Sequence, residues 1–323
     1  MFTNKDIEFR SIFVINCLDN KTLRVVNGEL FLEDTKENKT LTKIPFQKIL
    51  ALFIIGHISI TTALIDKCTK YGIPIVVTKT NFRPVFFFSI TAEANYLLRQ
   101  KQYEYDKNDL QIPKILVENK IQNQLKILTN TRLKIDTIQK AKDQCKKSLL
   151  SIPDISDYDS LLSLEGRVAK TYFSAYFKDL GWKSRYPRAK IDPLNSTLDI
   201  GYTILFNFIE SFVRLFGFDP YIGVYHKLWF RRKSLICDLV EPFRCIIDRK
   251  VRNAFNTKQC KNEDFNLFKN EYVLKYEKNS IYTKMFYDEL IQYKSNVFVY
   301  VRDYYRAFMQ RKSVPNFPRF LIK

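Results

Sequence analysis

The sequence predicts an α+β fold: a small β-sheet or β-sandwich region with one short helix at residues 1–90, followed by a larger all-α region at residues 91–323. Three observations support this prediction. Short runs rich in β-branched and aromatic residues fill the first part. After residue 92, apolar residues recur three and four positions apart. With 323 residues, the chain also exceeds the roughly 250–300 residues beyond which single cores stop growing, so we expect two domains.

The β-rich region is expected to begin with a strand at residues 11–18, followed by a hairpin. The runs LRVV and ELFLED flank Asn27-Gly28, a dipeptide that adopts the positive φ angles of a tight hairpin turn. A short helix is expected at residues 61–71, because Gly72 directly after it is a typical residue at a helix C-terminus. Three further apolar runs predict buried strands, at residues 49–55, 73–77 and 84–88.

Helices are expected to dominate the second region. Between Ile115 and Leu150, apolar residues recur at helical spacing among lysine, glutamine and asparagine. Prolines and glycines divide the region into several helices rather than one rod; they are Pro153, Gly181, Pro187, Pro193, Gly217, Pro220 and Pro242. The C-terminal segment RKSVPNFPRFLIK is expected to be a flexible tail.

The charge balance predicts a polyanionic partner. The chain has 53 Lys and Arg against 34 Asp and Glu, a formal net charge of +19. Because the cations are spread along the whole chain rather than concentrated in one amphipathic helix, nucleic acid is favoured over an anionic membrane surface.

Several protein classes are excluded by composition. No apolar run approaches the roughly 20 residues of a membrane-spanning helix, and the N-terminus MFTNKDIEFR lacks the features of a secretory signal. Six cysteines occur without a CxxC pair or a zinc-like spacing, which is typical of reduced thiols. We therefore expect a cytoplasmic protein without a zinc site.

One histidine and two carboxylates form a candidate metal site. His226 is followed by Asp238 and Glu241, and in so basic a chain this pattern indicates a metal held where phosphate is handled. The structural alternative is equally concrete: Asp238 and Glu241 have the spacing of a helix N-terminal capping box, and His226 is then an ordinary loop histidine. His57, beside a buried strand, is assigned that ordinary role.

Glu165 is a third candidate carboxylate. On a helix it shares one face with Leu161, Val168, Ala169 and Tyr172, so it lies on the apolar stripe. A carboxylate buried there needs a cation partner, a metal ion or a proton. A core salt bridge with an arginine of the following helices explains this position as well as a metal does.

Basic residues surround these candidates. Guanidinium groups can hold phosphates, while aromatic residues interleaved with them, such as Trp182 and Tyr186, can stack on unpaired bases. The DNA-binding candidates are Arg167, Lys183, Arg185, Arg188, Lys190, Arg231, Arg232, Lys233 and Arg244.

At this point the sequence resembles a known family. The phrases LEGRVAKTYF, DPLNSTLDIGYTILFNFIE, GFDPYIGVYH and SLICDLVEPFRCIIDRKV resemble the signature blocks of CRISPR-associated protein one, the integrase of CRISPR adaptation. The pattern N-x-x-L-R-x-x-Q at residues 95–102 is similar to that family's first helix, whereas residues 1–90 agree only in β character.

The resemblance implies roles for individual residues. Glu165, His226 and Glu241 match the family's three metal ligands, and Asp238 matches a further acidic position just before the third. Many members carry aspartate where this chain has Glu241. Asn195 and Tyr202 fall in the block between the ligands and are expected to shape the site.

The resemblance also implies an activity. We expect an integrase that uses Mg²⁺ or Mn²⁺ to join the 3′-hydroxyls of a short prespacer duplex to the ends of a CRISPR repeat. The expected assembly is a homodimer, two of which are bridged by a dimer of CRISPR-associated protein two, with the β-rich domain making the dimer and partner contacts. Two alternatives remain: a metal-dependent nuclease acting on branched or single-stranded DNA, and a non-catalytic DNA-binding scaffold.

Overall fold

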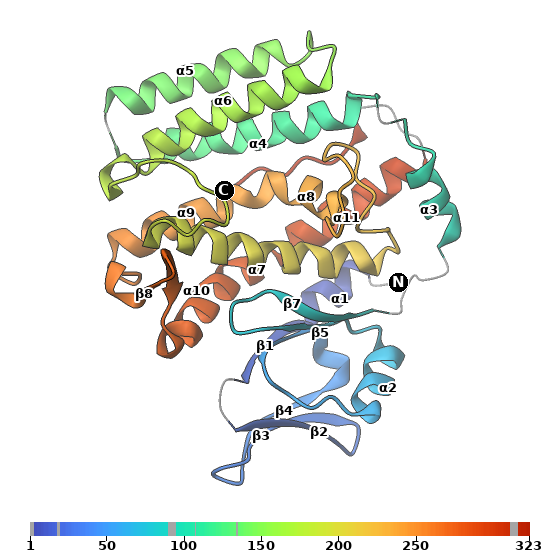
Figure 1. Cartoon of the computed structure of the whole chain (residues 1–323). Coiled ribbons are helices and arrows are strands. Elements are labelled where there is room, and N and C mark those ends of the chain that lie inside the picture. The colour runs from blue at the N-terminus through green and yellow to red at the C-terminus, as the bar shows by residue number, and fades with distance from the viewer. Residues whose placement is uncertain (1–2, 18–19, 90–94, 107, 134, 311–315) are drawn as a thin grey trace.

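The β-rich region lies at one end of the molecule and the helices α4, α5 and α6 lie at the other (Figure 1). The computed structural model describes residues 3–17, 20–89, 95–106, 108–133, 135–310 and 316–323. The order of a β-rich region followed by a largely helical one confirms the predicted α+β class. No helix in these described ranges is long and apolar enough to cross a membrane.

Two sheets form the β-rich region. The four-stranded sheet has the order β1-β5-β6-β7, with β1 parallel to β5, β5 parallel to β6 and β6 antiparallel to β7. The three-stranded sheet is an antiparallel meander of β2, β3 and β4. The strands are β1 (Ser11–Cys17), β2 (Lys21–Val26), β3 (Glu29–Asp34), β4 (Lys39–Pro45), β5 (Ile49–Gly56), β6 (Ile75–Thr78) and β7 (Pro84–Phe88).

Strand β5 is buried on both faces, which explains its unbroken apolar sequence. Leu52 and Ile54 pack into a core that includes Leu23 and Leu30 of the small sheet. On the opposite face, Phe53 belongs to the core of the helical region. The core of the helical region therefore extends across the boundary expected near residue 90, beside a second core between the two sheets.

The turn signals of this region are confirmed. Asn27 and Gly28 have φ angles of 49° and 80° between β2 and β3, as a hairpin turn of this kind requires. Helix α2 (Thr62–Tyr71) ends at Gly72, which has a φ of 66°. Two elements were not anticipated: a short helix α1 (Asn4–Phe9), which begins with a capping box from Thr3, and the mostly exposed strand β4.

The described residues form nine α-helices after the β-rich region. They are α3 (Tyr96–Tyr103), α4 (Gln111–Asn130), α5 (Asp136–Ser151), α6 (Tyr158–Tyr176), α7 (Pro193–Leu215), α8 (Ser234–Val240), α9 (Arg244–Asn256), α10 (Asn279–Gln292) and α11 (Lys294–Met309). The helical segment expected between Ile115 and Leu150 is two helices, α4 and α5, which pack against each other and against α6. Short 3₁₀ turns are η1 (Phe46–Lys48), η2 (Lys178–Leu180), η3 (Glu241–Phe243), η4 (Asn262–Asp264) and η5 (Tyr276–Lys278).

The expectation of an all-α second region is wrong in one detail. Strands β8 (Phe265–Phe268) and β9 (Glu271–Leu274) form an antiparallel hairpin between α9 and α10. Lys269 and Asn270 at its turn have φ angles of 48° and 63°. Because the strands are only four residues long and largely exposed, they carry no apolar alternation that sequence reasoning could detect.

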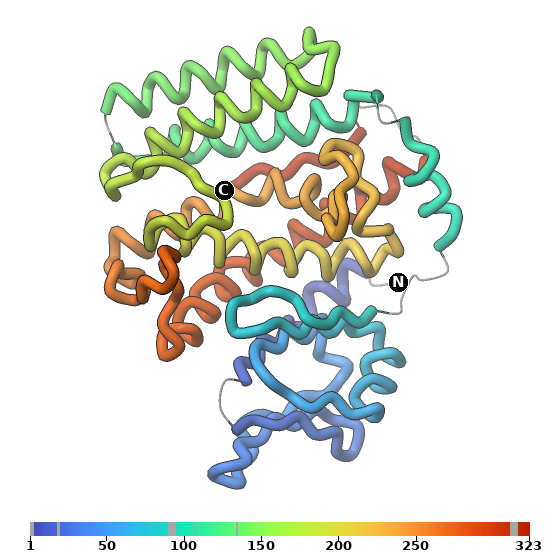
Figure 2. The backbone as a smooth tube through the Cα atoms, in the orientation of Figure 1, coloured from blue at the N-terminus to red at the C-terminus, as the bar shows by residue number. Residues whose placement is uncertain are grey.

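The expectation of a flexible C-terminal tail is wrong for residues 316–323. Phe320 and Ile322 are buried, and Figure 2 shows the chain end lying among the helices. The Phe320 N–H donates to Asn119 Oδ1 at 2.9 Å, and the Ile322 N–H donates to Asn123 Oδ1 at 2.8 Å. Two buried asparagines of α4 therefore satisfy the backbone of this segment, which explains why it stays docked.

Candidate active site

Three structural elements bring the predicted ligand residues into one part of the helical region. Glu165 lies on α6, His226 lies in the loop between α7 and α8, and Glu241 lies where α8 passes into η3. The helix α4 packs against both α6 and η3. Glu165 and Glu241 therefore lie on two elements that both contact α4.

Asp238 fixes the loop that carries His226. Its side chain is fully buried, and its Oδ2 accepts hydrogen bonds from the backbone N–H groups of Val224 and Tyr225 at 2.7 and 3.1 Å. Its Oδ1 accepts from the backbone N–H of His226 at 2.8 Å and lies 2.7 Å from Nδ1 of the same histidine. With Nδ1 held in this way, Nε2 is the ring atom that can bind a metal ion.

Asp238 does not cap a helix start, which corrects the capping-box alternative. It lies inside α8, and the N-cap residue of that helix is Lys233. Both of its oxygens already carry contacts to the His226 loop. We therefore assign Asp238 a positioning role and not that of a metal ligand.

Gly223 is required where the loop passes over α8. A Cβ atom at this position would lie 2.5 Å from Asp238 Oδ2 and 2.8 Å from the carbonyl carbon of Ser234. A side chain here would push the loop away from the carboxylate that anchors it. Gly223 thus permits the close approach on which the orientation of His226 depends.

The motif at residues 95–102 anchors the start of the same loop. The Gln102 side chain donates to the carbonyls of Asp219 and Ile222, both at 3.1 Å, and accepts from the Asp219 N–H at 2.8 Å. Asn95 donates to the Phe216 carbonyl at 3.1 Å. Helix α3 therefore fixes the chain as it leaves α7.

Glu165 and Glu241 share one cation, the ammonium group of Lys120 on α4. Lys120 Nζ lies 2.7 Å from Glu241 Oε2 and forms a closer pair with Glu165 Oε1. The other oxygen of Glu165 accepts a hydrogen bond from the Tyr225 hydroxyl. Of the alternatives left open for Glu165, the structure shows a cation partner. This cation is a lysine of a preceding helix, not an arginine of a following one.

Glu241 is the more deeply buried of the two carboxylates, with 4% of its side chain exposed. Burial alone would raise its pKa, but Arg244, Lys120 and His226 outweigh that effect and bring the pKa of Glu241 to about 2. Arg244 Nε lies 2.9 Å from Glu241 Oε1. The carboxylate is therefore ionised at neutral pH.

The donor set fits a hard divalent cation. Two carboxylates converge on one positive charge, and Glu241 Oε2, although close to Lys120, lacks a hydrogen bond of acceptable geometry among the described residues. Carboxylate oxygens with one imidazole suit Mg²⁺ or Mn²⁺. In the described residues, however, three or more His, Cys, Asp or Glu side chains are nowhere arranged closely enough to hold a metal ion, and the ammonium group lies between the two acids.

Asn195 and Tyr202, on α7, contact the basic residues beside the site. Asn195 Oδ1 accepts from Arg185 Nη1 at 3.0 Å, so this fully buried amide holds the loop before α7. The Tyr202 ring lies 4.7 Å from the guanidinium carbon of Arg244, and its hydroxyl donates to Asp248. Tyr202 thus adjoins the predicted site through Arg244, whereas Asn195 holds Arg185, which is paired with Asp199.

Asp248 on α9 is a buried carboxyl that sequence reasoning missed. The hydroxyls of Tyr172 and Tyr202 both donate to it, the first at 3.1 Å. Burial raises the pKa of Asp248 to about 6, against the opposing effect of these hydrogen bonds and of Arg244 and Lys120. Glu241 and Asp248, only seven positions apart in the chain, therefore have pKa values shifted in opposite directions.

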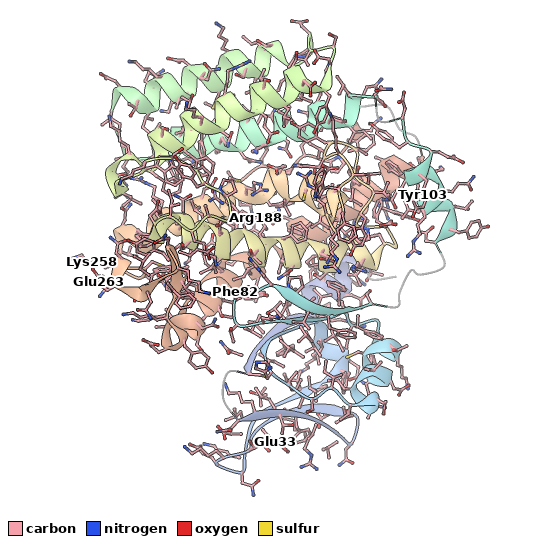
Figure 3. All side chains as sticks on the ribbon, viewed as in Figure 1. Glu33, Phe82, Tyr103, Arg188, Lys258 and Glu263 are labelled. Carbon is pink, nitrogen blue, oxygen red and sulfur yellow. The ribbon has the colours of Figure 1, made fainter. Side chains whose placement is uncertain are left out.

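The predicted DNA-binding residues divide into two groups. Four are paired within the chain: Arg185 with Asp199, Lys190 with Glu271, Lys233 with Glu210 and Arg244 with Glu241. Five are exposed: Arg167, Lys183, Arg188, Arg231 and Arg232. Arg188 lies in the loop before α7 (Figure 3), where its backbone N–H donates to Asp199.

Two exposed aromatic residues extend the basic loop after His226. Trp229 and Phe230 are 76% and 82% exposed, and Arg231 lies over the Phe230 ring at 5.2 Å. Large apolar side chains at such exposure, next to cations, are typical of a binding surface. The loop therefore presents stacking surfaces and positive charge beside His226.

Lys120 and Tyr225 are site residues that sequence reasoning missed. Lys120 shares a helix face with the buried residues Leu116, Val117 and Ile127, at spacings of four, three and seven. The same signal drew attention to Glu165, but spacing on one helix does not show which lysine of another helix pairs with it. Tyr225 directly precedes His226 and offered no separate signal.

Known proteins show the same sequence family and fold. The family model described as CRISPR associated protein Cas1 matches residues 17–288. An endonuclease Cas1 of Thermodesulfovibrio yellowstonii is 30% identical over 268 residues, which cover 77% of this chain and 81% of that protein.

Two solved structures share the fold at lower identity. A chain of a Cas6-RT-Cas1–Cas2 complex has a TM-score of 0.77 at 20% identity, covering 96% of this chain and 36% of that longer chain. A casposase bound to its integration product has a TM-score of 0.76 at 19% identity, covering 94% of this chain and 92% of that one.

Proposed function

This chain belongs to the Cas1 family of CRISPR-associated proteins, and from that premise we propose that it is a metal-dependent DNA integrase of spacer acquisition. Related proteins carry the name endonuclease, and a structural relative is a casposase bound to an integration product. An integrase or endonuclease role in CRISPR adaptation follows from the family. The use of a metal ion and of a 3′-hydroxyl nucleophile is our proposal.

The observation that carries this proposal is the convergence of Glu165 and Glu241 on one positive charge, beside an imidazole whose Nδ1 is already held by Asp238. We propose Glu165, Glu241 and His226 Nε2 as the ligands of a Mg²⁺ or Mn²⁺ ion. When bound, such an ion would lower the pKa of the attacking hydroxyl and offset negative charge at the phosphate.

The proposed reaction is a transesterification between two DNA strands, which the chain's own residues would position. The O3′ of the prespacer bonds to a phosphorus of the repeat while the bond from that phosphorus to the target strand's O3′ breaks. The attacking hydroxyl loses a proton and the leaving oxygen gains one, so no water is consumed. Asp238 keeps the imidazole oriented, and the exposed arginines of the loops before α7 and α8 hold the phosphates in line.

We also propose the assembly. Because each chain would carry one site and two DNA ends must be joined, a symmetric homodimer arrangement is favoured. The fold relative in the Cas6-RT-Cas1–Cas2 complex supports a partnership with CRISPR-associated protein two. For this chain we propose two dimers bridged by a dimer of that partner.

Strand transfer with matched variants tests the proposal. A labelled duplex with free 3′-hydroxyl ends, a plasmid carrying the cognate repeat and the cognate partner protein would be combined with Mn²⁺ or Mg²⁺. The wild-type chain, His226→Ala, Glu165→Gln and Glu241→Gln would be compared, with His57→Ala as the control because His57 is exposed and lies on the β-rich region. We expect label to join the plasmid only with the wild type and the control, and only with unblocked ends.

Other outcomes identify the alternatives. Nicking that does not depend on a free 3′-hydroxyl would identify a nuclease with water as its nucleophile. Equal DNA binding by all variants without any reaction would identify a non-catalytic scaffold.

A further inference from the structure

The two predicted acidic ligands are already neutralised inside the protein. Glu165 and Glu241 each carry one negative charge, while Lys120 and Arg244 each carry one positive charge in direct contact with them. The side chains of Lys120 and Glu165 are both only 12% exposed, and that of Glu241 is 4% exposed. Charges this far from water are tolerated only in such compensated groups.

Lys120 and Arg244 differ in what they contact. Arg244 binds Oε1 of Glu241 and stacks over Tyr202, so it is held from two sides. Lys120 bridges Glu165 of α6 to Glu241 of the α8–η3 junction, two segments more than 70 residues apart in the chain. An ammonium group on a flexible stem can leave such a position, whereas a stacked guanidinium is fixed.

The position of Lys120 conflicts with metal binding. Its ammonium group lies against one oxygen from each carboxylate, which is where a shared divalent cation would also be attracted. Adding two further positive charges to an already neutral group would be unfavourable unless one positive charge moved away. The metal and the ammonium group therefore cannot both hold these two oxygens.

We propose that Lys120 is the built-in counter-ion of the metal-free site: it holds Glu165 and Glu241 together without metal and is displaced when a divalent cation binds. This inference rests on the proposed function, because it takes the same carboxylates as metal ligands. It adds a residue that sets how tightly the metal binds and that holds the two acidic segments together in the absence of metal.

Metal binding by Lys120→Met tests the proposal at one fixed pH. Methionine keeps much of the length of the side chain without its charge. Mn²⁺ affinity would be measured by calorimetry or by the spin-resonance signal of unbound Mn²⁺, and Tm would be measured with and without Mn²⁺. Lys126→Met is the matched control, because Lys126 lies on the same helix but is exposed.

We expect Lys120→Met to lower Tm without metal, to bind Mn²⁺ on the order of tenfold more tightly and to gain more in Tm from Mn²⁺ than the wild type gains. Lys126→Met should match the wild type. Unchanged or weaker Mn²⁺ binding, with the same loss of Tm in both conditions, would show that Lys120 is only structural and would overturn the proposal.

A second measurement uses the wild-type chain and so does not depend on a variant that folds. Lysines would be acetylated briefly with a water-soluble reagent and the modified sites quantified by mass spectrometry, with Lys126 as the internal reference. We expect Lys120 to react slowly without metal and several-fold faster with Mn²⁺. Equal reaction in both conditions would contradict displacement.

The two proposals can fail separately. If the wild type binds Mn²⁺ and Glu241→Gln does not, but neither Lys120 measurement changes, only the counter-ion proposal is overturned. If the wild type does not bind Mn²⁺ at all, the metal site and the proposal built on it are both overturned.

Discussion

The two hydrophobic cores of the molecule differ in what they bury. Between the two sheets of the β-rich region, the buried side chains are almost all apolar, and Thr78 is the one buried polar residue described before residue 91. The helical region buries the charged residues Glu210, Asp238, Glu241, Asp248, Arg252 and Asp264. Buried charge is costly, so the helical region must supply partners for it, whereas the core between the sheets needs none. The candidate site lies in the region that buries charge.

The largest effect on stability is expected from a substitution in the apolar core around β5. Phe53 on β5 is fully buried and packs against Phe208 of α7 and Tyr287 of α10 at ring distances of 6.1 and 5.2 Å. Phe53→Ala should lower the free energy of unfolding by about 3–5 kcal/mol, because it removes a large buried ring and leaves a cavity. Urea denaturation followed by circular dichroism measures this loss.

The same experiment tests whether the two regions unfold together. Since Phe53 belongs to the core that spans both, we expect a single transition at lower urea. Two separate transitions would show that the regions are independent. Phe86→Ala, on β7 of the same sheet, is the control, because Phe86 is 41% exposed and its loss should cost much less.

The next largest effect is expected on Mn²⁺ affinity, from a substitution among the buried charged residues of the helical region. Asp238→Asn keeps the size of the side chain but removes the charge that holds His226 Nδ1. Mn²⁺ affinity should fall by about 10–100-fold, the typical loss when the partner of a ligating histidine is changed. Calorimetry measures this change, and Asp159→Asn, at an 86% exposed carboxylate of α6, should leave it unaltered. Full affinity in Asp238→Asn would contradict the positioning role.

A smaller effect is expected at the exposed loop beside His226. Trp229→Ser should weaken binding of DNA with unpaired 3′ ends by about tenfold, since one base–aromatic stack contributes about 1–3 kcal/mol. Binding of a fully paired blunt duplex should change less. Fluorescence anisotropy with both DNAs measures the difference. Phe268→Ser, at a 63% exposed position on β8, is the control, and an equal loss there would show a nonspecific effect.

The smallest effect is expected on the pH dependence of stability, in which Asp248, with its raised pKa, differs from Glu241, whose pKa is lowered. The pKa of Asp248 is raised from 3.8 to about 6, so the folded state holds its proton more tightly than the unfolded state does. Its contribution to stability is therefore full below pH 3.8 and is lost as the pH rises through 6. In Asp248→Asn this loss disappears, while the amide oxygen can accept from one tyrosine hydroxyl and the amide nitrogen can donate to the other.

The expected result is a pH-dependent difference in Tm. Asp248→Asn should be more stable than the wild type at pH 7 by on the order of 1 kcal/mol, or about 2 °C, and this difference should shrink as the pH falls from 6 towards 3.8. Thermal unfolding across this range measures it. Asp288→Asn, at a carboxylate that is 54% exposed, should show no such trend. A variant of Asp248 that loses stability at pH 7 would contradict the raised pKa.

Local signals made much of the fold predictable. Asn27-Gly28, Gly72 and the apolar run of β5 each determine structure through their immediate neighbours, and the structure places a turn, a helix end and a buried strand there. The hairpin β8–β9 and the strand β4 lacked such signals, because few of their side chains are buried. Their pairing depends on residues brought close by the rest of the fold.

The sequence indicated the acids and the histidine of the candidate site, but not the residues that contact them. Glu165 was recognisable because a carboxylate on an apolar stripe needs compensation. Which group compensates it depends on the packing of α4 against α6, so Lys120 could not be selected among many lysines from spacing alone. The roles of Asp238 and Glu241 likewise separate only when the path of the His226 loop is known.

The docking of residues 316–323 on α4 gives the molecule two natural reporters. The backbone N–H groups of Phe320 and Ile322 donate hydrogen bonds to Asn119 and Asn123, which lie next to Lys120 and one turn from it on α4. These protons can exchange with deuterium only when the segment lifts from α4. Their exchange rates would therefore measure how often residues 316–323 detach from α4, the helix that carries Lys120. This measurement requires no substitution in the candidate site.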